Sequence, residues 1–324
     1  MMLRVLLHLV IIQLVGGQFN PACFYVYPVM TSGQAFCNDA DQKLLVGDFD
    51  GSGRSDLLCR QNGSIEIFYN LLKRQKQTLD FCQIKNSQLT AADFNGDKKQ
   101  DLLCRANDGK MKVLLADETG KFKDSAENVK AIDTCDSKSY VGDFNGDGRA
   151  EIFCRHSDGK VSLSRMNTKG TFDGTEPMKW DWCDKEDELH AGDFNGDGRT
   201  DLLCRSSNNK VSIALANSMG KFNRTWSREW DWCNQDGVYL IVTDFNGDGY
   251  DDLFCYNSNL HEKSSVAFNT PYLYFKNGMK YQFHFCTRGG IDRFFVGFFN
   301  DDKRADIVCQ TAIGKPHIGF SHCA

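Results

Sequence analysis

The stretch DFNGDGRTDLLCR, residues 193–205, decides the fold, because it recurs along the chain. Close copies are DFDGSGRSDLLCR (48–60), DFNGDKKQDLLCR (93–105), DFNGDGRAEIFCR (143–155) and DFNGDGYDDLFCY (244–256), with a degraded copy, FFNDDKRADIVCQ (298–310). Successive copies start 45 to 54 residues apart, so six units account for nearly all of the 324 residues. Self-similarity at such a period is typical of a repeat array, and we expect residues 18–324 to form one domain.

Each unit is expected to contain four β-strands. A short apolar run such as 44–46 precedes the acidic loop, and Leu-Leu-Cys or Ile-Phe-Cys follows it. A turn such as Asn62-Gly63 leads into an alternating run such as 161–164, and an aromatic strand then ends at Cys183 or Cys233. Four strands in about 50 residues are typical of one propeller blade. The sequence therefore predicts an all-β fold, a single β-propeller of six four-stranded blades.

The D-x-[DN]-G-x-G-x-x-[DE] loop between two strands resembles the FG-GAP/VCBS repeat family, which includes the integrin alpha-chain propellers. The resemblance covers about residues 44–310 and rests on five copies of the loop. Relatives usually have seven blades, whereas the motif count and the length favour six here. Seven blades therefore remain the alternative.

The acidic loops have the spacing of calcium sites. Oxygen ligands stand at positions 1, 3, 5 and 9, with a main-chain carbonyl at position 7, and Ca²⁺ takes such hard oxygens. An EF-hand needs Glu at position 12 between helices, but here position 12 is Cys204 and the flanks are strands. We predict about five calcium ions, held by Asp48, Asp50, Ser52, Arg54 and Asp56; Asp93, Asn95, Asp97, Lys99 and Asp101; Asp143, Asn145, Asp147, Arg149 and Glu151; Asp193, Asn195, Asp197, Arg199 and Asp201; and Asp244, Asn246, Asp248, Tyr250 and Asp252.

Departures from the pattern predict that the loops differ in their affinity for calcium. Ser52 is a neutral ligand at position 5 of the first loop, and Lys98 replaces glycine at position 6 of the second, so both are expected to bind more weakly. In the sixth copy Phe298 replaces the first Asp and Lys303 the second Gly, and no ion is expected there. Because protein atoms fill every ligand position, calcium is expected to rigidify the hairpins rather than to catalyse.

The N-terminal segment predicts secretion. Residues 1–17 combine Arg4, an apolar run over 5–15 and small residues at the end, which is typical of a signal peptide; an uncleaved anchor is the alternative. The apolar run is too short to span a bilayer, and no longer one follows. Fourteen cysteines agree with an oxidising compartment, where Asn62 and Asn223 stand in usable glycosylation sequons.

The net charge argues against a nucleic-acid partner. The formal charge is −5, and five bound Ca²⁺ ions would bring it to about +5. Exposed Lys and Arg side chains, such as those in residues 73–76, could then bind anionic glycans. The simpler interpretation is that these side chains only face solvent.

The cysteines repeat with the blades and permit two pairing registers. One gives separations of 19 to 23 residues and the other 23 to 31. In the second register the partners would be about 9.5 Å apart, two strand spacings, which is beyond disulfide reach. We therefore predict Cys37–Cys59, Cys82–Cys104, Cys135–Cys154, Cys183–Cys204, Cys233–Cys255 and Cys286–Cys309.

The two remaining cysteines stand near the termini. We expect Cys23 and Cys323 to pair and lock the ring, with residues 24–29 completing the last blade. The chain-entropy model gives such a loop an effect of about 5 kcal/mol.

Two tryptophan pairs occupy equivalent places in neighbouring blades, Trp180 with Trp182 and Trp230 with Trp232. They either pack blade against blade or stack on sugar rings. Lectins with this kind of repeat bind glycans between neighbouring blades, and relatives usually meet their ligand on the face opposite the calcium loops. That resemblance would place contacts in the turns 155–160 and 205–210 as well.

The expected function is extracellular recognition of a glycan or glycoprotein. The alternative is a structural or adhesive matrix protein that binds a protein partner. The seven histidines show no metal-ligand spacing, and neither a G-x-S-x-G motif nor a phosphate-binding loop occurs, so an enzyme is not expected.

Overall fold

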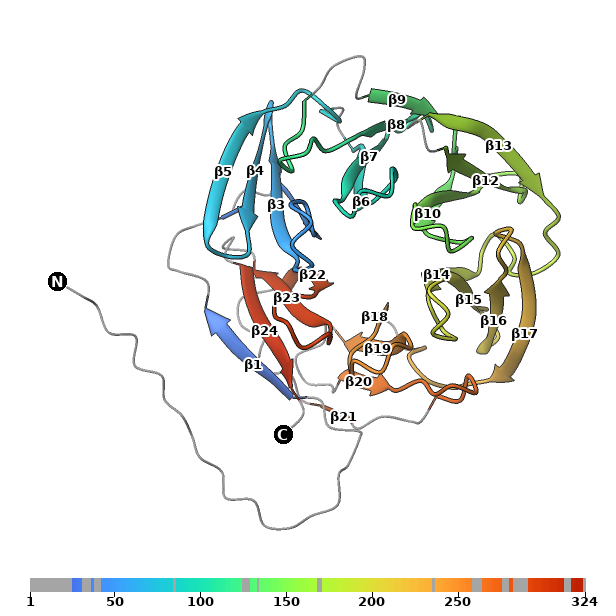
Figure 1. Ribbon diagram of the computed structural model, residues 1–324. Coiled ribbons are helices and arrows are strands. Elements are labelled where there is room, and N and C mark those ends of the chain that lie inside the picture. Colours follow the sequence, from blue (N-terminus) through green and yellow to red (C-terminus); the bar gives the residue numbers. More distant parts are fainter. Residues whose placement is uncertain are drawn as a thin grey trace, which may run out of the picture.

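The structure is a computed structural model that describes residues 25–30, 36–37, 42–83, 86–123, 129–132, 134–167, 171–234, 237–257, 264–275, 280–281, 291–311 and 316–322. Its regular elements are β-strands, arranged as six four-stranded antiparallel sheets around a central axis (Figure 1). The predicted six-bladed propeller is therefore confirmed. Within these ranges no helix is long and apolar enough to cross a membrane.

In each of the first three blades, the four strands follow one another in chain order from the central axis outward (Figure 1). Their strands are β2 (Lys43–Gly47), β3 (Asp56–Gln61), β4 (Ser64–Tyr69) and β5 (Lys73–Thr78); β6 (Gln88–Ala92), β7 (Asp101–Arg105), β8 (Met111–Leu114) and β9 (Val129–Ile132); and β10 (Lys138–Gly142), β11 (Glu151–Arg155), β12 (Val161–Met166) and β13 (Phe172–Met178). The acidic loops join the first two strands of each blade, as the repeat predicts.

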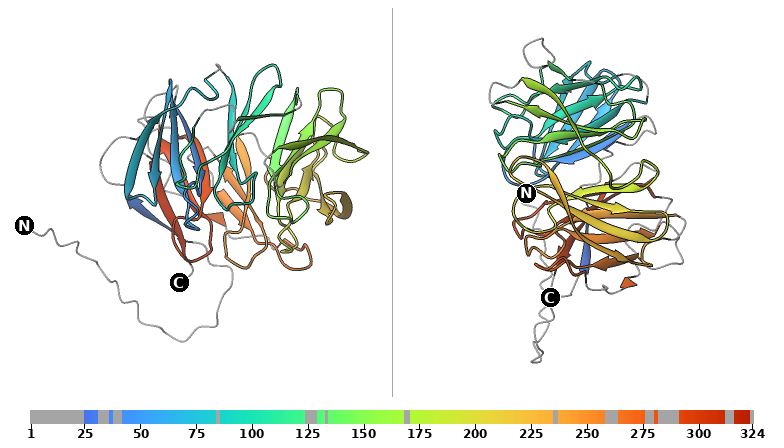
Figure 2. Two further views of the ribbon diagram at one scale, coloured as in Figure 1. Left: turned by 45° about the horizontal axis from the view of Figure 1, so that its top comes forward. Right: turned by 90° about the vertical axis from the view of Figure 1, so that its right-hand side faces the viewer.

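Blades 4 and 5 repeat this order, and blade 6 departs from it. The strands are β14 (Glu188–Gly192), β15 (Asp201–Arg205), β16 (Lys210–Ala216) and β17 (Phe222–Glu229); β18 (Val238–Thr243), β19 (Asp252–Asn257), β20 (Ser264–Ala267) and β21 (Lys280–Tyr281); and β22 (Ile291–Gly297), β23 (Asp306–Thr311), β24 (Pro316–His322) and β1 (Tyr25–Met30). The strands of each blade twist relative to one another, as the side views show (Figure 2).

The N-terminal strand closes the ring. β1 pairs antiparallel with β24, from Tyr25 opposite His322 to Met30 opposite His317, and forms the outer edge of blade 6. The predicted completion of the last blade by the N-terminal segment is confirmed. The predicted Cys23–Cys323 bond lies outside the described residues.

The hydrophobic core is divided into six clusters, one between each pair of neighbouring blades. The residue at position 2 of each acidic loop is a phenylalanine with at most 7% of its surface exposed, namely Phe49, Phe94, Phe144, Phe194, Phe245 and Phe299. Among the described residues, four of these rings meet a ring of the next blade, as in the 5.5 Å contact between the centroids of Phe144 and Phe222. The loops are therefore anchored by apolar contact as well as by their polar groups.

Backbone hydrogen bonds join the blades on the loop face. In every loop the N–H at position 8 donates to the carbonyl at position 1 of the preceding loop, and Thr200 N to Asp143 O is one example at 2.6 Å. The sixth loop takes part, because Ser55 N donates to Phe298 O across the closing interface. Degeneration of that loop has therefore left the ring contact intact.

Arginines and disulfides join the blades on the opposite face. The Arg after the second-strand cysteine donates to the carbonyl of the next connector's cysteine, as Arg155 does to Cys183 O at 2.9 Å. Gln310 makes the same contact with Cys37 O at the closing interface. Five predicted disulfides are confirmed, Cys37–Cys59, Cys82–Cys104, Cys135–Cys154, Cys183–Cys204 and Cys233–Cys255. Cys309 is disulfide-bonded too, and its predicted partner Cys286 lies outside the described residues.

Candidate functional site

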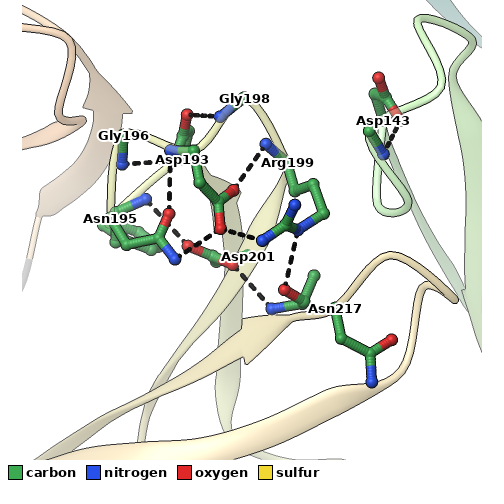
Figure 3. Close-up of polar contacts among 12 residues, drawn as sticks. Asp143, Asp193, Asn195, Gly196, Gly198, Arg199, Asp201 and Asn217 are labelled. Atoms are coloured by element: carbon green, nitrogen blue, oxygen red, sulfur yellow. Dashed lines mark hydrogen bonds and ion pairs between the residues drawn. The ribbon is translucent and has the colours of Figure 1, made fainter.

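The fourth acidic loop shows how the predicted ligand residues are held (Figure 3). Asp193 accepts hydrogen bonds from Gly196 N at 2.8 Å and Gly198 N at 2.7 Å, so its carboxylate organises the turn. Asn195 Nδ2 donates to Asp197 Oδ2 at 2.8 Å, and Asp197 Oδ1 accepts from Arg199 N at 3.0 Å. The side chains at positions 1, 3 and 5 therefore belong to one closed loop between β14 and β15.

The acid at position 9 has a structural task that the sequence did not reveal. Asp201 accepts Phe194 N at 3.1 Å and Ala216 N at 2.7 Å, which ties the loop to the end of β16. The bond from the position-2 N–H recurs in all six blades, including the 2.9 Å contact from Phe299 N to Asp306. The sixth loop keeps this acid although Phe298 replaces the position-1 Asp, so position 9 holds the hairpin even in a loop where no ion is predicted.

Two of the five predicted clusters have three carboxylates grouped tightly enough to hold a metal ion. They are Asp48, Asp50 and Asp56 in the first loop, and Asp143, Asp147 and Glu151 in the third, with carboxylate oxygens within 4.8 Å of one another. In the other three predicted loops, whose ligand residues the structure describes, the three carboxylates do not all lie within that distance of one another. The position-5 acid pairs with a local cation in loops of both kinds, Lys99 with Asp97, Arg149 with Asp147 and Arg199 with Asp197.

Burial leaves the negative charge of these loops poorly compensated. It raises the pKa of Asp56, Asp101 and Asp201 from 3.8 to about 7, and nearby loop carboxylates add to the shift. The pKa of Glu151 rises from 4.5 to about 7 for the same main reason. A bound cation would offset this cost, so the donor set fits a hard divalent ion.

The departures noted in the sequence leave the loop backbone unchanged. Lys98 adopts the left-handed conformation of a glycine, with φ of 69°, and its N–H donates to Asp93 at 2.7 Å. In the first loop Asn70 joins the site, because its Nδ2 donates to Asp50 at 3.3 Å and its N–H to Asp56 at 2.7 Å. Asn70 lies 20 residues beyond Asp50, so loop spacing alone could not identify it.

The first tryptophan pair is half-buried where β13 leads into blade 4. Trp180 and Trp182 meet edge to face with ring centroids 5.3 Å apart. Trp180 Nε1 donates to Cys183 O at 3.0 Å, and Trp182 Nε1 donates to Ser212 Oγ of blade 4 at 2.8 Å. Both indole N–H groups are therefore satisfied internally.

A cleft of about 400 Å³ lies beside this pair, between the outer strands of blades 3 and 4. It is lined by Glu176, Pro177, Met178, Lys179, Trp180, Asp181, Trp182, Ala214, Lys221, Phe222 and Arg224. The pairing of β12 with β13 shifts register between Ser164 and Met166, so Phe172 packs toward blade 2 whereas Met178 and Trp180 pack toward blade 4. This bulge directs the second half of β13 into the cleft.

The second tryptophan pair has a different environment. Trp230 is 7% exposed and stacks on Trp232 with centroids 4.9 Å apart. The Arg228 guanidinium lies 4.0 Å from the centroid of the Trp230 ring, and Phe275 lies 5.6 Å away. Arg228 stands where the first pair has Met178, so the chain's own side chains cover Trp230.

A Ser-His-Asp connectivity occurs in blade 3. His156 Nε2 lies 2.8 Å from Ser162 Oγ, and His156 Nδ1 lies 3.3 Å from Asp136 Oδ1. Ser162 is only 5% exposed on the internal strand β12, and its counterparts Ser212 and Ser265 accept bonds from Trp182 and Trp232. The hydroxyl at this position therefore holds a connector or turn by a hydrogen bond, and this structural role accounts for the contact between Ser162 and His156.

The remaining predicted surface features lie on different parts of the ring. Asn62 is exposed in the turn between β3 and β4, and Asn223 is exposed on β17. Residues 73–76 lie on β5, where the Arg74 guanidinium packs 4.8 Å from the Phe68 ring centroid. None of these residues lines the cleft between blades 3 and 4.

Comparison with known proteins gives the following similarities. Residues 48–104, 93–154 and 193–255 match the family described as FG-GAP-like repeat. A search of the curated proteins gives no match.

Among solved structures, the chain is similar to an Agrocybe aegerita lectin whose structure concerns specific recognition of non-reducing terminal N-acetylglucosamine. The two chains are 18% identical, with a TM-score of 0.61 over 88% of this chain and 80% of that one. The BP39L lectin from Burkholderia pseudomallei is 10% identical, with a TM-score of 0.53 over 87% and 82%. AofleA from Arthrobotrys oligospora is 9% identical, with a TM-score of 0.54 over 92% and 86%. At these identities the similarity shows the propeller fold.

Proposed function

The chain belongs to the FG-GAP-like repeat family, and from this premise we propose that it is a secreted, calcium-stabilised propeller that binds glycans between blades 3 and 4. The observation that carries the proposal is the cleft of about 400 Å³ lined by Trp180 and Trp182. A sugar ring presents an apolar face that stacks on an indole, and a cleft of this volume accommodates a small ligand.

Calcium supports the site indirectly in this proposal. The predicted ligand residues stand in loops that bridge the first two strands of five blades, and buried acids there have raised pKa values. Bound Ca²⁺ supplies positive charge to these carboxylates. The loops themselves order the ring, because each position-1 carbonyl accepts a bond from the next blade. We therefore assign calcium a stabilising role.

We assign the two tryptophan pairs different roles. Trp180 and Trp182 are half-buried and border the cleft, whereas Arg228 and Phe275 pack against Trp230. The first pair is the proposed ligand platform, and the second packs blade 4 against blade 5. The Agrocybe aegerita lectin, which shares the fold, provides a precedent for sugar recognition by such a propeller.

Secretion is part of the proposal. The five disulfides are consistent with an oxidising compartment, and residues 1–17 have the composition of a signal peptide. A recognition role outside the cell fits this location.

The test is binding of the purified mature protein to an immobilised glycan panel, with competition by free sugar. We expect saturable binding that free sugar displaces and that Trp182→Ala abolishes. Trp182→Phe keeps an aromatic face but loses the bond to Ser212, so it should retain part of the binding. Leu72→Ala, at a side chain 85% exposed in blade 1, is the matched control and should bind normally.

Two results would contradict the proposal. One is silence across the panel from folded, calcium-loaded protein, which would favour a protein partner in a matrix or adhesive role. The other is sugar-displaceable binding that survives Trp180→Ala and Trp182→Ala, which would place the ligand elsewhere on the ring.

A further inference from the structure

The charges around the cleft between blades 3 and 4 are unbalanced. Its lining contains three cations, Lys179, Lys221 and Arg224, and two acids, Glu176 and Asp181. The Glu176 carboxylate is engaged by Arg165 Nη1 at 2.8 Å and lies 3.9 Å from Lys221 Nζ. One of the two acids is therefore already neutralised by protein.

Two of the cations are available to a ligand. Lys179 and Arg224 are exposed, and neither has an ion-pair partner among the described residues. Arg224 faces the cleft because a bulge opposite Ile213 and Ala214 separates it from Trp226, which packs on Phe275 of blade 5. The strand irregularity therefore places a guanidinium beside the aromatic floor.

The polar groups of the floor are already occupied. The Nε1 atoms of Trp180 and Trp182 donate to Cys183 O and Ser212 Oγ, so these side chains offer ring faces only. Charged side chains at the rim must supply the directional recognition of a ligand. Guanidinium groups bind carboxylates and sulfates through parallel charge-assisted hydrogen bonds.

Resting on the proposed glycan-binding function, we propose that the cleft selects acidic glycans, whose terminal sugar carries a carboxylate or a sulfate. The pyranose ring lies on the tryptophan pair, and the anionic group is bound by Arg224 with Lys179 beside it. The ion pair between Glu176 and Arg165 remains intact when the ligand binds and forms the blade 3 side of the cleft.

The experiment compares lactose, 3′-sialyllactose and 3′-sulfated lactose by calorimetry at low and high salt. We expect the two acidic sugars to bind at least about tenfold more tightly than lactose, because each gains charge-assisted hydrogen bonds. The advantage should shrink at high salt, because exposed charges are screened. The two acidic probes distinguish carboxylate from sulfate.

Arg224→Gln should lower the affinity for the two acidic sugars to about that for lactose, and because Arg224 is exposed the melting temperature should not change. Lys73→Gln, an exposed cation on β5 outside the cleft, is the matched control and should keep the preference. Equal affinity for all three sugars, or a preference that survives Arg224→Gln, would overturn the inference and leave glycan binding intact. Failure of all three sugars to bind to protein that binds the glycan panel would overturn the inference alone, whereas silence across the panel as well would overturn the proposed function with it.

Discussion

Removal of calcium should invert the way in which acid acts on stability. Burial raises the pKa of Asp56, Asp101 and Asp201 from 3.8 to about 7 in the folded protein without metal. Between pH 4 and pH 7 the folded state then binds more protons than the unfolded state, so its free energy of unfolding rises as the pH falls. With calcium in the loops the carboxylates stay ionised, and acid instead displaces the ion.

The magnitude follows from the shift. Lowering the pH from 8 to 5 protonates a carboxyl of pKa about 7 in the folded state, whereas the unfolded chain stays largely ionised. About two pKa units are realised in this window, which corresponds to about 2–3 kcal/mol for one group. At about 2 °C per kcal/mol in a protein of this size, a single group should raise the melting temperature by about 5 °C.

The assay is a thermal melt of protein freed of metal on a chelating resin, because a dissolved chelator would itself respond to pH. Each melt is repeated with millimolar CaCl₂ at pH 8, 7, 6 and 5. We expect the increase in melting temperature caused by calcium to be largest at pH 8 and to shrink steadily toward pH 5. A calcium effect that is absent at pH 8, or that has the same size at every pH, would refute the reasoning.

Four further predictions address the ring and its surface. Asp306→Ala should lower the free energy of unfolding by about 1–3 kcal/mol, equally with and without calcium, because Phe299 N and Ser321 N lose their acceptor. Asp193→Ala should instead reduce the stabilisation that calcium adds, and scanning calorimetry with and without calcium distinguishes the two effects. Arg155→Met leaves the Asp187 carbonyl unpaired and removes one of the two hydrogen bonds to Cys183 O, so it should lower the free energy of unfolding in urea by about 1–3 kcal/mol, whereas Lys160→Met, at an exposed side chain, should not. The double variant Cys82→Ser/Cys104→Ser opens a loop of 22 residues and should lower stability by about 3 kcal/mol, so an unchanged melt would contradict the role of that bond. Asn62→Gln and Asn223→Gln should each remove one glycan from protein secreted by eukaryotic cells, seen as a mass loss that matches glycosidase treatment.

The repeat is sufficient to predict the fold from the sequence. Asp193 and its four counterparts recur with Leu-Leu-Cys or a similar apolar triplet after them, and this local pattern requires a hairpin in every blade. The pairing of Cys183 with Cys204 followed as well, because strand spacing excludes the other register. The completion of blade 6 by β1 was predicted together with the pairing of the two cysteines that remain near the termini, Cys23 and Cys323.

The position-9 acids have a second role that local spacing does not indicate. The sequence placed Asp201 among the metal ligands, but its two oxygens also accept Phe194 N and Ala216 N, and the second lies 15 residues away. Asp306 does the same in a loop without a predicted ion. Only the folded hairpin brings these amides together.

The four strands of each repeat and the spacing of the acidic loops were thus predictable from the sequence alone, because each depends on residues close together in one repeat. The sequence favoured six blades over seven, and the closed ring of six sheets decided between them. The choice between the tryptophan pairs was decided by tertiary structure. The motifs at 180–183 and 230–233 are identical in sequence, yet Met178 leaves the first pair beside a cleft whereas Arg228 covers the second. The physical reason is that a surface between blades is shaped by side chains from two repeats, together with bulges that turn a strand's residues from one neighbour to the other.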